Sequence, residues 1–233
     1  MFERFAHRSQ ELERLDTGDY TPEEYAKWLK EARLINRWLG DASALRSELA
    51  DDAWLAEAEQ VSILDIGAGS GELLKSAKEF IDPKRTFLVG SELSGAAALE
   101  IRSRAAEFGV VAVQCDGTRL PFDDDSFDIV ICSLLLHHLS DDKAEQLIAE
   151  MRRVAKQRFI IIDLHRDPVA FYLYRIFSPL FLQPMTVEDG SLSILRSFRP
   201  GEVRALADNA GAGDAVVRRA AFRLILSGSK RPV

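Results

Sequence analysis

Residues 63–71 read ILDIGAGSG and belong to an apolar run that starts at residue 61. The run 61–66 predicts a buried strand, and a helical pattern begins near Ser70. The loop between them holds three alternate glycines, Gly67, Gly69 and Gly71. Glycine can adopt positive φ and let a ligand approach the backbone, while the start of the helix presents unpaired N–H groups. We therefore expect a ligand to bind at this loop.

Acidic residues on both sides of the loop indicate which ligand. Asp65 precedes it, and Glu72 stands where the dinucleotide fingerprint G-x-G-x-x-G needs its third glycine. The loop resembles motif I of class I S-adenosylmethionine-dependent methyltransferases. Two carboxylates would repel a pyrophosphate but can neutralise the ammonium and sulfonium of S-adenosylmethionine. The charge pattern favours the methyl donor as cofactor over a nicotinamide dinucleotide. A plain turn that needs glycine for its geometry is the other interpretation.

The composition is that of an ordinary globular protein. Of 233 residues, 47% are apolar and 29% charged, and the formal net charge is -7. An acidic chain without a basic block predicts a small-molecule substrate rather than nucleic acid. Cys115 and Cys132 are expected on strands that are not neighbours, so we expect no disulfide. The charged start of the sequence lacks a signal-peptide core, which predicts a cytoplasmic location.

Residues 1–60 are predicted to form an N-terminal arm and cap helices. Residues 1–20 are polar and aperiodic, and we expect a partner or ligand to order them. Thr21 and Glu24 form a capping box that starts a helix, and a second helix is expected from Asp41 to about Glu59. The first helix carries an apolar stripe, made of Tyr25, Trp28, Leu29, Ala32, Ile35 and Leu39. Helices at this position often cover the active site in the resembled family. The other interpretation, favoured for most residues of the stripe, is that the stripe packs on the sheet.

From residue 61 strands and helices alternate, which predicts an α/β fold with a parallel sheet between two layers of helices. The resemblance implies a Rossmann-like domain over 61–233, with a seven-stranded, mostly parallel sheet and an antiparallel last strand. Strands are expected at 61–66, 86–91, 110–114, 127–133, 158–163, 215–219 and 222–226.

The donor site is expected at the ends of the first strands. Glu92 lies about twenty residues past the glycine loop, where a carboxylate can accept hydrogen bonds from both ribose hydroxyls. The resemblance implies that Asp116 accepts from the adenine amino group. The predicted cofactor-binding residues are Asp65, Gly67, Ala68, Gly69, Gly71, Glu92, Leu93, Asp116, Gly117 and Ser133.

The segment CDGTRLPFDDDSFDIVICSLLLHHL, residues 115–139, looks like the ubiquinone-biosynthesis-like branch of small-molecule methyltransferases. A D-x-x-x-L-P-F element precedes the fourth strand in that branch. Asp123, Asp124 and Asp125 are consecutive, so they cannot converge on one metal ion, and we predict a solvated loop and no metal site.

Residues 167–183 are rich in aromatic and aliphatic side chains. They are too short and too often interrupted to span a bilayer. We expect a helical insertion at the ligand end of the sheet, either as an apolar lid, which would suit an apolar substrate, or as a core helix.

Three histidines are candidate general bases for a phenol or enol that must lose a proton. His137 and His138 follow the fourth strand and His165 follows the fifth, and both places face the methyl donor in the resembled fold. Because adjacent side chains point differently, at most one of the pair should reach the substrate. His138 is preferred, then His165, and packing roles are equally open for each.

Two further segments narrow the resemblance. Both segments look similar to bacterial methyltransferases that act on polyketide-derived phenols. The first reads RSQELERLDTGDYTPEEY and is followed, further along the chain, by INRWLG, and the second reads DGSLSILRSFRPGEVRALADNAG. This similarity favours O-methylation of a phenolic or apolar hydroxyl, as in secondary metabolism. The alternatives are C-methylation of a quinone-type precursor and a protein that holds S-adenosylmethionine without turnover. The sequence does not indicate an oligomeric state.

Overall fold

Seven strands form one sheet in the computed structural model, which describes residues 3–38, 40–50, 52–82, 84–103, 109–220 and 222–230. Their order across the sheet is β3-β2-β1-β4-β5-β7-β6. The strands are β1 (Val61–Ile66), β2 (Thr86–Glu92), β3 (Val110–Gln114), β4 (Phe127–Ser133), β5 (Ala155–Leu164), β6 (Val216–Ala220) and β7 (Arg223–Ser229).

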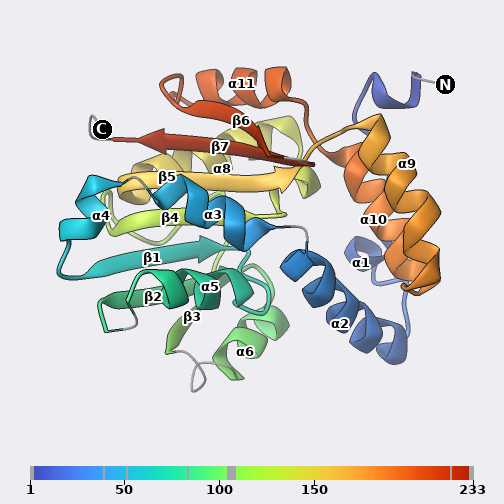
Figure 1. Cartoon of the computed structure of the whole chain (residues 1–233), viewed down its shortest axis with the longest axis horizontal. Coiled ribbons are helices and arrows are strands. Elements are labelled where there is room, and N and C mark those ends of the chain that lie inside the picture. Colours follow the sequence, from blue (N-terminus) through green and yellow to red (C-terminus); the bar gives the residue numbers. More distant parts are fainter. Residues whose placement is uncertain are drawn as a thin grey trace.

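The first five strands are parallel, and β7 is antiparallel to both β5 and β6. In the centre, Ile63 of β1 pairs with Ile129 of β4, and the carboxyl ends of these strands lie at one edge (Figure 1). The predicted fold class is confirmed, including the antiparallel last strand. Cys115 and Cys132 are both free.

Helices cover both faces of the sheet because successive strand side chains point to opposite sides. Val130 and Cys132 pack in one core cluster with α8 and α11, whereas Ile129 and Ile131 pack in another with α3, α5 and α6. Figure 1 shows these layers. The helices here are α3 (Asp41–Leu49), α5 (Glu72–Phe80), α6 (Gly95–Ser103), α8 (Asp141–Val154) and α11 (Pro200–Asn209).

A second group of helices lies beyond the carboxyl ends of β1, β4 and β5, at the right of Figure 1. It comprises α1 (Arg14–Thr17), α2 (Pro22–Trp38), α9 (Pro168–Phe177) and α10 (Pro184–Arg196). The predicted capping box starts α2, since Thr21 Oγ1 accepts from the Glu24 amide and a Glu24 oxygen accepts from the Thr21 amide. Leu39 of the predicted stripe lies outside the described residues. The structure thus places a helical cap over the edge where ligands bind in open α/β sheets.

The arm differs from expectation, because the chain itself holds it in place. Phe5, in the short 3-10 helix η1 (Glu3–Phe5), is fully buried beside Phe171 and Ile194. Arg8 donates to the backbone carbonyls of His137, Leu139 and Arg196. The polar composition of the arm predicted that it would need a partner or ligand for order. Instead, its few apolar and cationic side chains contact distant segments of the same chain.

Two helix predictions also need correction. The helix expected from 41 to 59 is divided into α3 and α4 (Ala53–Glu57), since Asp52 takes an extended conformation. The sequence interpretation also missed α10, which follows the insertion. The serines and Gly190 along α10 obscured its apolar periodicity.

Candidate active site

The glycine loop joins β1 to α5 with positive φ at each predicted glycine. At Gly69, φ is 56°, and a Cβ atom there would meet nothing within 4 Å. Residues other than glycine rarely adopt this backbone conformation, and the space beside it is open. A ligand can therefore approach the backbone closely here. The loop therefore fits the methyl donor that the sequence predicts.

Glu92 lies at the carboxyl end of β2 and reaches back to this loop. One of its carboxylate oxygens, Oε1, accepts a hydrogen bond from the Gly69 amide at 2.5 Å. Burial raises the pKa of Glu92, although the hydrogen bond from Gly69 opposes this. The structure brings the loop and the expected ribose-binding carboxylate together, and the ribose contact itself remains a prediction.

Asp65 is the most deeply buried acid of the donor site, with 2% of its surface exposed. Its Oδ1 atom has no hydrogen-bond partner in the described part of the chain. Burial, with Glu92 nearby, holds the pKa of Asp65 well above its usual range. A buried, unsatisfied carboxylate is costly, and a cationic ligand group would satisfy it. This orphan oxygen is an independent observation that fits the ammonium of S-adenosylmethionine.

The other predicted donor residues have distinct surroundings. Asp116 is exposed, and its Oδ1 accepts from the amide and hydroxyl of Thr118, which lowers its pKa. Only glycine fits at position 117, because a Cβ atom there would lie 2.6 Å from Ile66. Leu93 is exposed and Ala68 packs against the second core cluster. Their contacts with the donor stay predictions.

Ser133 ends β4 and opens a network that the sequence did not indicate. Its hydroxyl donates to Asp41 Oδ2 at 3.1 Å, and Arg223 Nε donates to Asp41 Oδ1 at 2.5 Å. Asp41 and Arg223 are both buried. The pair fixes the start of α3 against the strand end, so Ser133 has a structural partner in addition to its predicted role.

His137 is held on both sides. It is 3% exposed within the 3-10 helix η2 (Leu136–His138). Its Nδ1 lies 2.6 Å from Asp163 Oδ1, and its Nε2 lies 3.9 Å from Glu13 Oε1. Burial alone would raise the pKa of Asp163, but His137 and two backbone amides hold it below its usual value. Both ring nitrogens of His137 therefore face carboxylates.

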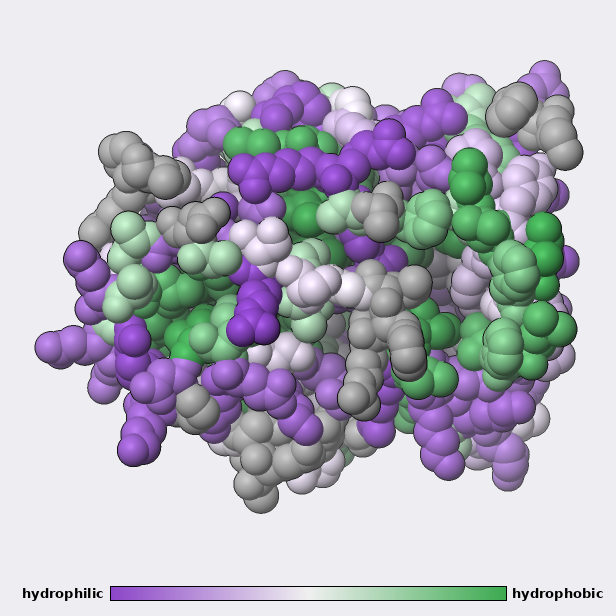
Figure 2. Space-filling view, in the orientation of Figure 1, coloured by the Kyte–Doolittle hydropathy of each residue, from purple (hydrophilic) through white to green (hydrophobic). Residues whose placement is uncertain are grey.

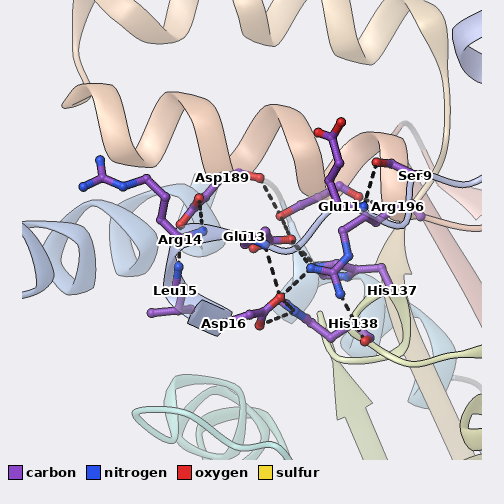
Figure 3. A network of polar contacts seen from close by, with 12 residues as sticks. Ser9, Glu11, Glu13, Arg14, Leu15, Asp16, His137, His138, Asp189 and Arg196 are labelled. Carbon is purple, nitrogen blue, oxygen red and sulfur yellow. Dashed lines mark hydrogen bonds and ion pairs between the residues drawn. The ribbon is translucent and has the colours of Figure 1, made fainter. Parts of the chain in front are cut away.

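The ring of His138 lies beside that of His137, with centroids 4.2 Å apart and planes tilted by 37°, but its surroundings differ. Its side chain is 22% exposed, and Nδ1 lies 3.1 Å from Asp16 Oδ1 (Figure 3). Arg196 of α10 contacts both Asp16 and the His138 carbonyl. His138 is thus the more accessible member of the pair.

His165 directly follows β5, and an acidic neighbour of its ring is Asp167. Its amide donates to the Phe222 carbonyl, and it forms an isolated bridge with Phe198. Its buried Nδ1 has no hydrogen-bond partner among the residues that the structure describes, and it lies 3.7 Å from Asp167 Oδ2. Burial, with Arg219 nearby, lowers the pKa of His165. The structure therefore brings two of the three candidate histidines together.

The histidine pair has neighbours that sequence reasoning missed. Glu13, His137 and His138 place ligating atoms within 4.8 Å of one another, which is close enough to consider a metal ion. Arg196 Nη1, however, lies 3.5 Å from Glu13 Oε1 and 2.5 Å from Asp16 Oδ2, so a guanidinium supplies positive charge at this place. No local sequence signal links the arm to α10, because these contacts exist only in the folded chain.

The acidic run 123–125 forms a surface loop. Asp124 pairs with Arg153 at 2.9 Å and Asp125 with Lys230 at 2.6 Å. Asp124 and Asp125 therefore pair with two different cationic side chains.

Most of α9 is not buried, so the insertion is not a core helix, and its role as a lid stays a prediction. Along α9 and the following 3-10 helix η3 (Ser178–Leu180), Ala170 and Phe171 face inward. Apolar side chains gather on the outer surface, as Figure 2 shows over α9. They are Val169, Leu173, Ile176, Phe177, Leu180 and Phe181. None of the described helices is long and apolar enough to cross a membrane.

Residues 63–158 match the family model described as a methyltransferase domain. The match starts in β1, ends in β5 and contains the glycine loop, Glu92 and the histidine pair. This segment of the chain therefore has the sequence pattern of a methyltransferase domain.

The methyltransferase domain has relatives among curated proteins and solved structures. It is 33% identical over 138 residues to the uncharacterized methyltransferase YcgJ of Bacillus subtilis (strain 168), covering 56% of this chain and 52% of YcgJ. It is 34% identical over 121 residues to the ubiquinone/menaquinone biosynthesis C-methyltransferase UbiE of Burkholderia orbicola (strain MC0-3), covering 48% of each. The chain spans about half the length of these curated relatives.

A crystal structure of a SAM-dependent methyltransferase from Aquifex aeolicus shares the fold of the methyltransferase domain. The TM-score is 0.61 at 16% identity, covering 90% of this chain and 98% of the other. This likeness extends beyond the matched segment and includes most of the cap.

Proposed function

We propose that the chain transfers a methyl group from S-adenosylmethionine to a hydroxyl of a small apolar or phenolic molecule. The observation that carries this proposal is the position of a glycine loop and a histidine–carboxylate pair at one end of the sheet. The segment that leads to the histidines touches the loop, since Leu135 Cδ2 would lie 3.1 Å from a Cβ on Gly67. Donor and base can therefore serve one reaction.

The donor side of the proposal uses residues at the first two strand ends. Asp65 offers its unsatisfied oxygen to the donor ammonium, and Glu92 offers its carboxylate to the ribose. These residues would hold S-adenosylmethionine, which, when bound, would supply an activated methyl group. Holding the two reactants at reacting distance provides most of the rate enhancement for an in-line displacement.

On the acceptor side, His138 is the proposed base. Asp16 occupies its Nδ1 side, so Nε2 is the nitrogen that accepts the hydroxyl proton. His137 is less suited, because Asp163 and Glu13 flank its two nitrogens. The ionised Asp16 would stabilise the imidazolium that forms.

C-methylation of a quinone-type precursor is the second candidate. The similarity to a ubiquinone/menaquinone biosynthesis C-methyltransferase supports it. The same base could deprotonate a phenol ring precursor, after which carbon rather than oxygen is methylated. A protein that holds the donor without turnover is the third alternative, and the two adjacent histidine–carboxylate pairs count against it.

Calorimetric titration with S-adenosylhomocysteine, with NAD as control, tests the donor. We expect micromolar binding of S-adenosylhomocysteine alone, and binding of NAD alone would overturn the donor assignment. Incubation with methyl-labelled donor, phenols and reduced quinone precursors then tests the acceptor. NMR of the product separates a new O–CH3 from a new C–CH3 group. Donor binding with no transfer to any hydroxyl would contradict O-methylation.

A further inference from the structure

A carboxylate of the N-terminal arm lies directly against the proposed base. Asp16, within α1, places Oδ1 and Oδ2 at 3.1 and 3.4 Å from His138 Nδ1. The two residues are 122 positions apart in the chain. The contact is therefore a product of the docked arm rather than of the methyltransferase motifs.

Arg196 fixes both members of this pair. Its Nη1 donates to Asp16 Oδ2 at 2.5 Å, and its Nη2 donates to the His138 carbonyl at 3.1 Å (Figure 3). Arg196 is 5% exposed, so the donor side of these bonds is buried. Burial would raise the pKa of Asp16, but His138 and Arg196 hold it well below its usual range. Asp16 is thus an ionised, immobilised acceptor.

The backbone of α1 is also anchored independently of Asp16. Asp189 of α10 accepts hydrogen bonds from the amides of Arg14 and Leu15, at 2.9 and 3.2 Å. Glu13 accepts from the Ser193 hydroxyl at 2.9 Å. The arm therefore has other contacts that keep it on α10 when the Asp16 carboxylate is removed.

We propose that Asp16 is a positioning residue for His138, and that the N-terminal arm completes the acceptor site of this enzyme. The inference rests on the proposed role of His138 as base. Asp16 holds the neutral imidazole as the Nδ1–H tautomer and turns Nε2 toward the acceptor hydroxyl. When Nε2 takes the proton, the carboxylate stabilises the resulting imidazolium, and Arg196 prevents Asp16 from rotating away.

The roles of the two histidines follow from their carboxylates. Nδ1 of His137 contacts Asp163 of β5, and its Nε2 faces the buried carboxylate of Glu13. His138 takes its partner from the arm and stays partly exposed. Of the two, His138 combines a fixed tautomer with access, which a general base requires.

The test replaces Asp16 with Asn in the full chain, with Asp19→Asn as matched control. Asp19 lies on the same arm, and its side chain is 83% exposed. The first measurement is the 15N spectrum of the histidine rings, with His138 assigned by its loss in His138→Asn. We expect the Nδ1–H tautomer in the parent and in Asp19→Asn, and a shift toward the Nε2–H tautomer in Asp16→Asn.

The second measurement is kcat as a function of pH, with S-adenosylhomocysteine affinity measured alongside. In Asp16→Asn we expect kcat to fall roughly 10- to 100-fold. This is less than the rate enhancement that a general base provides, because the base itself is still present. We also expect the acidic limb of the profile to move to lower pH, while donor affinity changes by less than about 2-fold. Asp16→Glu restores a carboxylate and should recover the parent tautomer and part of the rate.

Two results would overturn the positioning role. One is an unchanged tautomer and pH profile in Asp16→Asn, and the other is an Asp16→Glu variant that behaves like Asp16→Asn in both measurements. Failure of the proposed base is recognised separately, because His138→Asn would then retain the parent rate. The tautomer measurement needs no acceptor, so it decides the contact even if the methylated molecule is of another class.

Discussion

The two halves of the proposed active site are built in different ways. The donor half is made by the ends of β1, β2, β3 and β4 and the loops that follow them, so each residue lies close in sequence to the strand that positions it. The acceptor half joins α1, η2 and α10, and Arg196 is separated from Asp16 by 180 positions. Substitutions in the donor half should therefore act on cofactor binding alone, and those in the acceptor half on chemistry and arm docking.

The largest effect is expected in the donor half. Gly69→Val should abolish S-adenosylhomocysteine binding, because a branched side chain would fill the open space at φ 56° and strain the backbone. Calorimetry measures the affinity. Gly211→Val is the matched control, since Gly211 also has positive φ and open space but follows α11. Equal affinity in the two variants would refute the loop as the donor site.

The next effect tests the acceptor half. His138→Asn should lower kcat by roughly 10²- to 10⁴-fold, the usual contribution of a general base, and leave donor affinity unchanged. Labelled-methyl transfer and calorimetry measure the two quantities. His7→Asn, an exposed histidine on the arm, should match the parent. A loss of donor affinity equal to the loss of rate would contradict the separation of the two halves.

A smaller effect is expected for the ribose carboxylate. Glu92→Ala should weaken S-adenosylhomocysteine by roughly 1 to 3 kcal/mol, the cost of losing charge-assisted hydrogen bonds. It also removes the bond from the Gly69 amide, so the loop itself should loosen. Glu79→Ala, an exposed acid on α5, is the control. Normal binding by Glu92→Ala would exclude the ribose role.

The smallest effect concerns how the arm is held. Burial raises the pKa of Glu13 to about 7, although His138, Ser193 and Arg196 oppose this. A raised carboxyl pKa means that the folded state binds the proton more tightly than the unfolded state. Stability from this group is therefore present in acid and is lost as pH rises from the unfolded value of 4.5 to about 7.

Glu13→Gln should remove this dependence. We expect it to raise the free energy of unfolding at pH 8, relative to the parent, by on the order of 1 kcal/mol, and to change it little at pH 4. Urea unfolding at both pH values measures this. Glu11→Gln, an exposed acid on the same arm, should follow the parent. A parent-like pH dependence in Glu13→Gln would show that Glu13 is not the titrating group.

Much of the fold was predictable because its signals are local. Alternating apolar runs indicated each strand, and the spacing of glycines indicated the loop where β1 ends. Helix boundaries were less certain. The break between α3 and α4 and the existence of α10 depend on packing against other segments, which overrides weak periodicity.

The sequence by itself determined the sheet, the class of cofactor site and the residues at its strand ends. These features follow from side-chain periodicity and backbone geometry, which neighbouring residues specify. Only the tertiary structure decided which carboxylate meets which histidine. Glu13 and Asp16 lie in a polar arm without apolar periodicity, and Phe5 and Arg8 dock that arm on distant segments. Such pairings depend on long-range packing, so they appear only when the whole chain is folded.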